Sequence, residues 1–152
     1  MKTRRVRWLG IAAIALLALA ACSKAGASSG GGLSTKSISG VGTVLVNAAG
    51  LTLYDLPSEA NGNITCTGAC AQAWPPLLAA GGKVPSAPSA IASKLGTVNR
   101  PDGGVQVTYN GLPLYTFAGE SAGQASGQGV SGFVAATVSG GASSSSGGIP
   151  GY

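Results

Sequence analysis

An internal repeat is the feature of this 152-residue chain that most restricts its fold. Residues 44–56 align without a gap on residues 105–117, at an offset of 61 residues. Six aligned pairs are identical, namely Val44/Val105, Val46/Val107, Gly50/Gly111, Leu51/Leu112, Leu53/Leu114 and Tyr54/Tyr115. This agreement favours a true repeat over chance similarity between two hairpins, so both copies are expected to fold alike.

Each copy has the pattern of a β-hairpin: an alternating strand, a turn and a second strand through Leu-x-Leu-Tyr. The turns fall at residues 47–50 and at Asn110-Gly111, and Asn-Gly is the strongest short hairpin signal. Because a lone hairpin is marginal in water, the two copies are expected to pack together or to pair edges.

Other short patterns complete the expected secondary structure. Residues 96–99 and 132–138 are β-prone, whereas residues 70–73 and 91–95 could each form a turn or two of helix. The sequence therefore predicts a mainly β, small single domain, built from two hairpin-containing repeats with short helical turns.

The N-terminus has the pattern of a bacterial export signal. The apolar segment of residues 8–21 has 14 residues, fewer than the ~20 of a spanning helix. Residues 19–22 (Leu-Ala-Ala-Cys) resemble a lipobox, which predicts cleavage after residue 21 and lipidation of Cys22. An ordinary secretory cleavage site, with Cys22 incidental, is the alternative. The basic residues that precede the apolar segment are Lys2, Arg4, Arg5 and Arg7.

The composition of the flanking segments predicts how the exported part is organised. Residues 22–39 and 140–152 are rich in Ser and Gly, and such segments cannot bury enough apolar surface to become ordered. We expect a flexible tether at 22–39, a two-repeat domain at 40–139 and a disordered tail at 140–152. In a cell with two membranes, Ser23 after the cysteine favours the outer membrane.

Charge and composition exclude several function classes. The chain has no histidine, which removes Ser-His-Asp and Cys-His catalysis and His-ligated metals. Loss of residues 1–21 deletes four basic and no acidic residues, so the formal charge falls from +5 to +1. The remaining cations are scattered, which argues against a nucleic-acid partner; they are Lys24, Lys36, Lys83, Lys94 and Arg100. No S-x-x-K pattern occurs, and without histidine no serine has the base of a Ser-His pair, so we expect no catalytic residues, cofactor or metal.

The segment from Cys66 to Pro76 contains Cys66, Cys70 and Trp74 followed by two prolines. Two cysteines of an exported protein usually form a disulfide, because the compartment is oxidising. The alternative is a redox or copper-handling pair. The sequence has no His, however, and its only Met is the initiator, which the mature chain lacks. Trp74 is expected to anchor the core over the disulfide or over one hairpin.

Glu59 and Glu120 occupy nearly equivalent places in the two copies. Paired carboxylates can hydrolyse glycosides, but that chemistry needs dissimilar environments for the acid and the base. Their symmetric placement favours a structural role, such as accepting N–H groups of a turn.

These motifs together resemble the bacterial lipoproteins described as a secreted repeat of unknown function, which carry a Tyr-x-aromatic-x-x-Asp motif. The resemblance covers roughly residues 40–139. The second copy has Tyr115, Phe117 and Glu120 at the motif positions, with Glu in place of Asp. The first copy has Tyr54, Leu56 and Glu59, and so departs twice, which weakens any specific role such as cation binding.

The resemblance implies a lipid-anchored, envelope-facing protein of two repeats with no known activity. The sequence thus predicts an exported, non-catalytic binding or structural module, attached to the bacterial cell membrane through Cys22. The ligand or partner is not identified. A redox or copper-handling accessory using Cys66 and Cys70 is the alternative.

Overall fold

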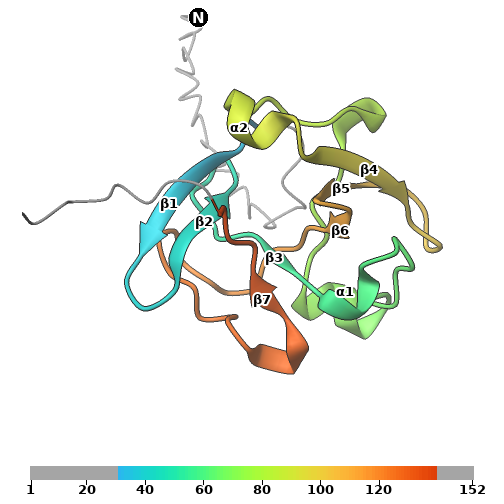
Figure 1. The fold of residues 1–152 in the computed structure, drawn as a ribbon. Coiled ribbons are helices and arrows are strands. Elements are labelled where there is room, and N and C mark those ends of the chain that lie inside the picture. The colour runs from blue at the N-terminus through green and yellow to red at the C-terminus, as the bar shows by residue number, and fades with distance from the viewer. Residues whose placement is uncertain (1–30, 140–152) are drawn as a thin grey trace, which may run out of the picture.

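The computed structural model describes residues 31–139 (Figure 1). The predicted signal peptide, Cys22 and the C-terminal tail lie outside these residues. In chain order the elements are β1 (Ser34–Ile38), β2 (Gly42–Val46), β3 (Tyr54–Asp55), a 3₁₀ turn (Pro57–Glu59), α1 (Ala69–Ala73), a 3₁₀ turn (Ala80–Gly82), α2 (Ser89–Ala92), β4 (Leu95–Asn99), β5 (Val105–Tyr109), β6 (Leu112–Pro113), a 3₁₀ turn (Val130–Gly132) and β7 (Val134–Ala135).

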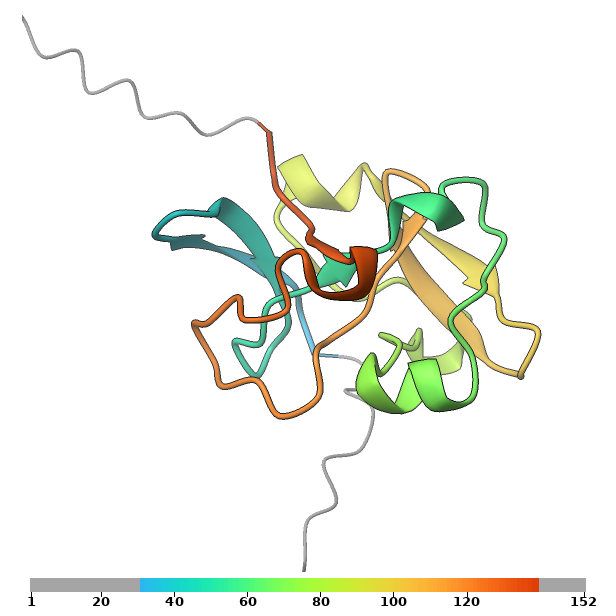
Figure 2. The same ribbon diagram turned by 90° about the horizontal axis from the view of Figure 1, so that it is seen from below.

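The prediction of a mainly β fold with short helical turns is confirmed. The described strands form three small antiparallel sheets, β1-β2, β3-β7 and β4-β5-β6. Figures 1 and 2 show β1-β2 and β4-β5-β6 on opposite sides of the molecule, with β3 and β7 between them. The central pair joins a strand of the first copy to the strand that ends the second.

Both aligned segments form hairpins, but their turns differ in length. In the second copy Tyr109 pairs with Leu112 around Asn110 and Gly111, whose φ angles of 51° and 82° fit a two-residue type I′ turn. In the first copy Val46 pairs with Thr52, and the N–H of Asn47 donates to the carbonyl of Leu51. The loop between Asn47 and Leu51 is therefore one residue longer than the turn of the second copy. The Asn47 side chain stabilises this loop, because Oδ1 accepts the N–H groups of Ala49 and Leu51 at 3.0 Å each.

The predicted tether of residues 22–39 is wrong at its C-terminal end. Residues 34–38 form β1 and pair along their whole length with β2, and Leu33 is buried in the core. The side chains of β1 are mostly exposed, so backbone pairing rather than apolar burial orders this strand. A criterion based on apolar composition misses an edge strand of this kind, and the folded domain begins near residue 33.

The two aligned segments meet at Tyr54 and Tyr115, the equivalent residues of the repeat. The N–H of Tyr54 donates to the carbonyl of Tyr115 at 2.9 Å, and the N–H of Tyr115 donates to the carbonyl of Tyr54 at 2.8 Å. Matching bonds continue outward, from Leu77 N–H to the carbonyl of Leu114 and from Ala136 N–H to that of Leu53. These reciprocal contacts are those of a local two-fold relation, which brings the polar residues of both motifs together.

Candidate functional site

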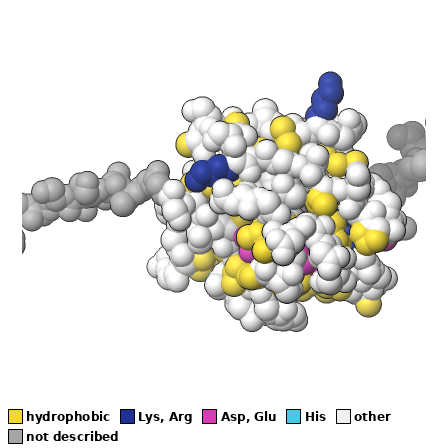
Figure 3. All heavy atoms as spheres, turned by 45° about the vertical axis from the view of Figure 1, so that its right-hand side comes forward, with side chains coloured by type: hydrophobic (Ala, Val, Ile, Leu, Met, Phe, Trp, Pro, Cys, Tyr) yellow, Lys and Arg dark blue, Asp and Glu magenta, His cyan; other side chains and the backbone are white. Residues whose placement is uncertain are grey.

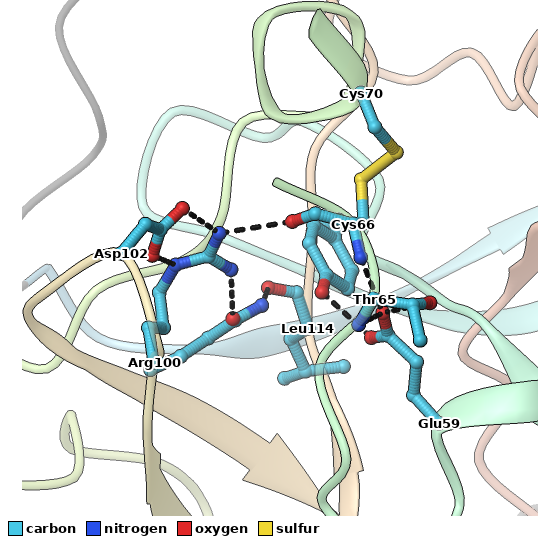
Figure 4. Close-up of polar contacts among 9 residues, drawn as sticks. Glu59, Thr65, Cys66, Cys70, Arg100, Asp102 and Leu114 are labelled. Carbon is cyan, nitrogen blue, oxygen red and sulfur yellow. Dashed lines mark hydrogen bonds and ion pairs between the residues drawn. A yellow bond between two sulfur atoms is a disulfide. The ribbon is translucent and has the colours of Figure 1, made fainter. Parts of the chain in front are cut away.

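Glu59, in the first copy of the motif, is completely buried. The 3₁₀ turn that begins at Pro57 places its carboxylate against the chain that follows. Oε1 accepts the N–H of Thr65 at 2.6 Å, the hydroxyl of Thr65 at 3.0 Å and the N–H of Cys66 at 2.8 Å (Figure 4). Oε2 accepts the hydroxyl of Tyr115 at 2.6 Å, so every contact of this carboxylate is internal.

Glu120, in the second copy, makes the corresponding contacts. Its Oε1 accepts the N–H of Ser126 at 2.6 Å, the hydroxyl of Ser126 at 2.9 Å and the hydroxyl of Tyr54 at 2.6 Å. Ser126 lies 61 residues after Thr65, the same offset that relates the two motifs. Glu120 is only partly buried, and its Oε2 has no hydrogen-bond partner among residues 31–139.

The tyrosine of each motif therefore donates to the glutamate of the other motif. Burial of Tyr115 and its hydrogen bond to Glu59 raise the pKa of its hydroxyl, so the group stays protonated and donates. Burial of Tyr54 and its hydrogen bond to Glu120 likewise raise the pKa of the Tyr54 hydroxyl. Both glutamates also accept backbone N–H groups, as their symmetric placement in the sequence predicts. We call this arrangement the crossed Tyr–Glu contacts, formed by Tyr54, Glu59, Tyr115 and Glu120.

A buried arginine adds a second polar connection between the copies. Arg100 donates through Nη2 to the carbonyl of Cys66 at 2.9 Å and through Nη1 to Oε1 of Gln106 at 2.6 Å. Gln106 in turn donates through Nε2 to the carbonyl of Leu114 at 2.8 Å. Figure 4 shows Arg100 and Glu59 approaching Cys66 from different sides.

Asp102 neutralises this arginine at the edge of the fold. Nε and Nη2 of Arg100 donate to the two carboxylate oxygens of Asp102 at 2.7 and 2.6 Å. Burial alone would lower the pKa of Arg100, but the bond to Asp102 raises it, and the same bond lowers the pKa of Asp102. Sequence reasoning missed Arg100 as a buried group, although the Arg-Pro-Asp-Gly turn of residues 100–103 was the available signal.

Aromatic side chains from both copies meet in one cluster. Trp74 is buried and stacks on Phe133 with ring centroids 3.8 Å apart. Tyr54 meets Trp74 edge-on at 5.4 Å, and Tyr115 meets Phe133 in the same way at 5.3 Å. Phe117 lies half-buried against Trp74 at 4.5 Å. The expectation that Trp74 anchors the core agrees with this packing.

Cys66 and Cys70 are joined by a disulfide, which agrees with the prediction for two cysteines of an exported protein. Among residues 31–139, no group of three or more His, Cys, Asp or Glu side chains lies close enough together to hold a metal ion. No helix in this described part of the chain has the length and apolar character needed to cross a membrane.

Comparison with known proteins identifies a family for part of the chain. Residues 96–136 match the family described as a secreted repeat of unknown function, which confirms the predicted resemblance over this part of the chain. That description supports export of the protein. No curated protein and no solved structure matches the chain.

Asp55 gives the domain an expected dependence on pH. Its side chain is buried, accepts no hydrogen bond within the described residues, and has a pKa raised by burial from 3.8 to about 6. Because the folded state holds this proton more tightly, the contribution is fully present below pH 3.8 and is lost as the pH rises through about 6.

We therefore expect Asp55→Asn to increase the free energy of unfolding at pH 7.5 by about 1–2 kcal/mol, a value reduced for partial solvation, and to change it little at pH 4. Urea titrations of both proteins at the two pH values measure this difference. An equal effect at the two pH values would show that Asp55 does not titrate in this range.

Proposed function

We propose that this protein is a lipid-anchored, non-catalytic module of the bacterial cell envelope. The observation that carries the proposal is the crossed Tyr–Glu contacts. Glu59 is completely buried, and both motif tyrosines donate to motif glutamates instead of facing solvent. A motif used in this way holds a domain together, and the domain then presents its surface for binding or spacing.

The anchor in this proposal is Cys22. A lipoprotein cysteine carries a diacylglyceryl group, and two or more acyl chains hold a protein stably at a membrane, whereas one holds it only marginally. Because β1 begins at Ser34, residues 23–33 separate the anchor from the first strand. Fully extended, these residues span at most roughly 40 Å, so the domain stays close to the surface that holds it.

The face shown in Figure 3 fits a module without a membrane-binding surface of its own. Its apolar side chains lie in small groups between polar atoms. Among the described residues, the large apolar side chains that are exposed are Val84 and Val130. Retention at a membrane is therefore expected to depend on the lipid of Cys22.

Mass spectrometry of the mature protein from membranes tests the proposal. We expect an N-terminal peptide that begins at Cys22 and carries the mass of a diacylglyceryl group, with or without a third acyl chain. A mature N-terminus before or after Cys22, with no acyl mass, would contradict the proposal.

The second candidate is a redox or copper-handling accessory. The observation in its favour is the Cys66–Cys70 disulfide, which could cycle as a dithiol. Copper binding would require both thiolates to be released from that bond. Titration of thiols in protein isolated without reductant separates the candidates, because a substantial free-thiol fraction would favour cycling.

A further inference from the structure

The short helix α1 is held to the domain in an unusual way. None of the residues of Ala69–Ala73 is buried, so little apolar packing fixes the helix, and Cys70 is its residue that contacts the aromatic cluster. The N–H of Trp74 donates to the carbonyl of Cys70 at 2.8 Å, and the N–H of Ala118 donates to that of Ala73 at 2.9 Å. Besides these bonds and the main chain on either side, the disulfide from Cys70 to Cys66 ties α1 to the core.

Cys66, at the other end of that bond, lies where the two copies meet. Its N–H donates to Glu59, and its carbonyl accepts from Arg100 of the second copy. Glu59 in turn accepts the hydroxyl of Tyr115. The position of the Cys66 backbone therefore affects two contacts that join the first copy to the second.

The second copy makes the same kind of loop without a disulfide. Gly127 lies 61 residues after Cys66, and its N–H donates to the hydroxyl of Tyr54 at 3.1 Å. A Cβ at this position would lie 2.8 Å from Trp74 and 2.9 Å from Tyr54, so glycine is required there. Since this loop closes without a covalent bond, the crossed contacts do not themselves require the disulfide. The bond in the first copy adds a property that the second lacks.

We propose that the Cys66–Cys70 disulfide is a redox latch that controls whether α1 is docked. Cys70 is half-buried, whereas Cys66 is almost completely buried, so a thiolate reaches the Cys70 sulfur first. Attack breaks the S–S bond, releases Cys66 as a thiol after protonation, and leaves a mixed disulfide on Cys70.

The electron balance requires a dithiol partner, such as an exported dithiol protein. The partner's second thiolate then attacks the partner's first sulfur in the mixed disulfide. This releases Cys70, which takes up the second proton. Two electrons and two protons thus pass from the dithiol to this protein, and the partner becomes a disulfide. The inference rests on export and on the described contacts, and it is independent of lipid attachment at Cys22.

Release of α1 has a defined structural consequence. The helix leads directly into Trp74, and its last carbonyl bonds to the chain just after Phe117. When the latch is open, residues 67–73 lose their fixed position, and the half-buried edge of the aromatic cluster at Phe117 becomes more accessible. The core bonds between Tyr54 and Tyr115 stay closed, because they involve neither cysteine.

Hydrogen exchange of the full chain, with and without a dithiol reductant, tests the latch. We expect the amides of Cys70, Gln72 and Trp74, which bond within the latch segment, to lose at least tenfold in protection after reduction. The amides of Tyr54 and Tyr115 should keep their protection. The amide of Val130, which donates to Gly127 in the copy without a disulfide, should keep its protection too. Reoxidation should restore the original pattern.

A Cys66→Ser/Cys70→Ser variant is the matched control. With or without reductant, its amides at residues 70, 72 and 74 should show the low protection expected for the reduced wild-type protein. Unchanged exchange of the latch amides after verified reduction would overturn the proposal. Loss of protection throughout the domain would also overturn it, because the bond would then staple the whole fold.

Discussion

Replacing Glu59 by alanine is expected to lower the free energy of unfolding by about 3–5 kcal/mol. The substitution leaves two backbone N–H groups, of Thr65 and Cys66, and the hydroxyl of Tyr115 without their acceptor. Because Glu59 is completely buried, water does not replace the carboxylate readily. A loss of this size is a large fraction of the ~5–15 kcal/mol that stabilises a typical domain.

Glu120→Ala is the matched control in the second copy. It also removes an acceptor from a tyrosine and from a backbone N–H group, but Glu120 is only partly buried. Water can reach these donors, so we expect a loss of about 1–2 kcal/mol. Urea titration of both variants measures the difference. An equal or smaller loss in Glu59→Ala would show that burial of this carboxylate does not determine its contribution.

Replacing Cys22 by alanine is expected to abolish membrane retention almost completely. Without the acyl chains the exported domain should appear in the soluble fraction, or the unprocessed precursor should stay in the membrane through residues 8–21. Fractionation followed by mass measurement separates these outcomes, since the precursor retains residues 1–21.

Ser23→Ala is the control for the Cys22 substitution, because it changes the neighbouring residue and leaves the acylated position intact. It should remain fully in the membrane fraction. A processed Cys22→Ala protein that stays in the membrane fraction as the wild type does would contradict lipid anchoring.

Local signals in the sequence predict the hairpins well. The turn at Asn110 and Gly111 follows from two adjacent residues that tolerate positive φ, and the disulfide follows from two nearby cysteines in an exported protein. The offset of 61 residues also relates the backbone N–H groups of Thr65 and Ser126, which donate to Glu59 and Glu120. Each of these features is determined by residues that lie close together in the chain.

Long-range features were harder to predict, because they depend on which segments meet. The exposed side chains of β1 carry no apolar pattern, so its pairing with β2 is visible only in three dimensions. Arginine is usually found at the protein surface, yet the fold buries Arg100 between Asp102, Gln106 and Cys66. The sequence equally gives no sign that each tyrosine bonds to the glutamate of the other motif.

The central claim is that the motif tyrosines and glutamates join the two copies in the crossed arrangement. Double-mutant cycles in urea test it, with Tyr→Phe and Glu→Gln substitutions combined in each pair. We predict coupling energies of about 1–2 kcal/mol for Tyr115 with Glu59 and for Tyr54 with Glu120. The uncrossed pair, Tyr115 with Glu120, should be additive within about 0.5 kcal/mol. Additive crossed pairs, or strong coupling within one motif, would contradict the account.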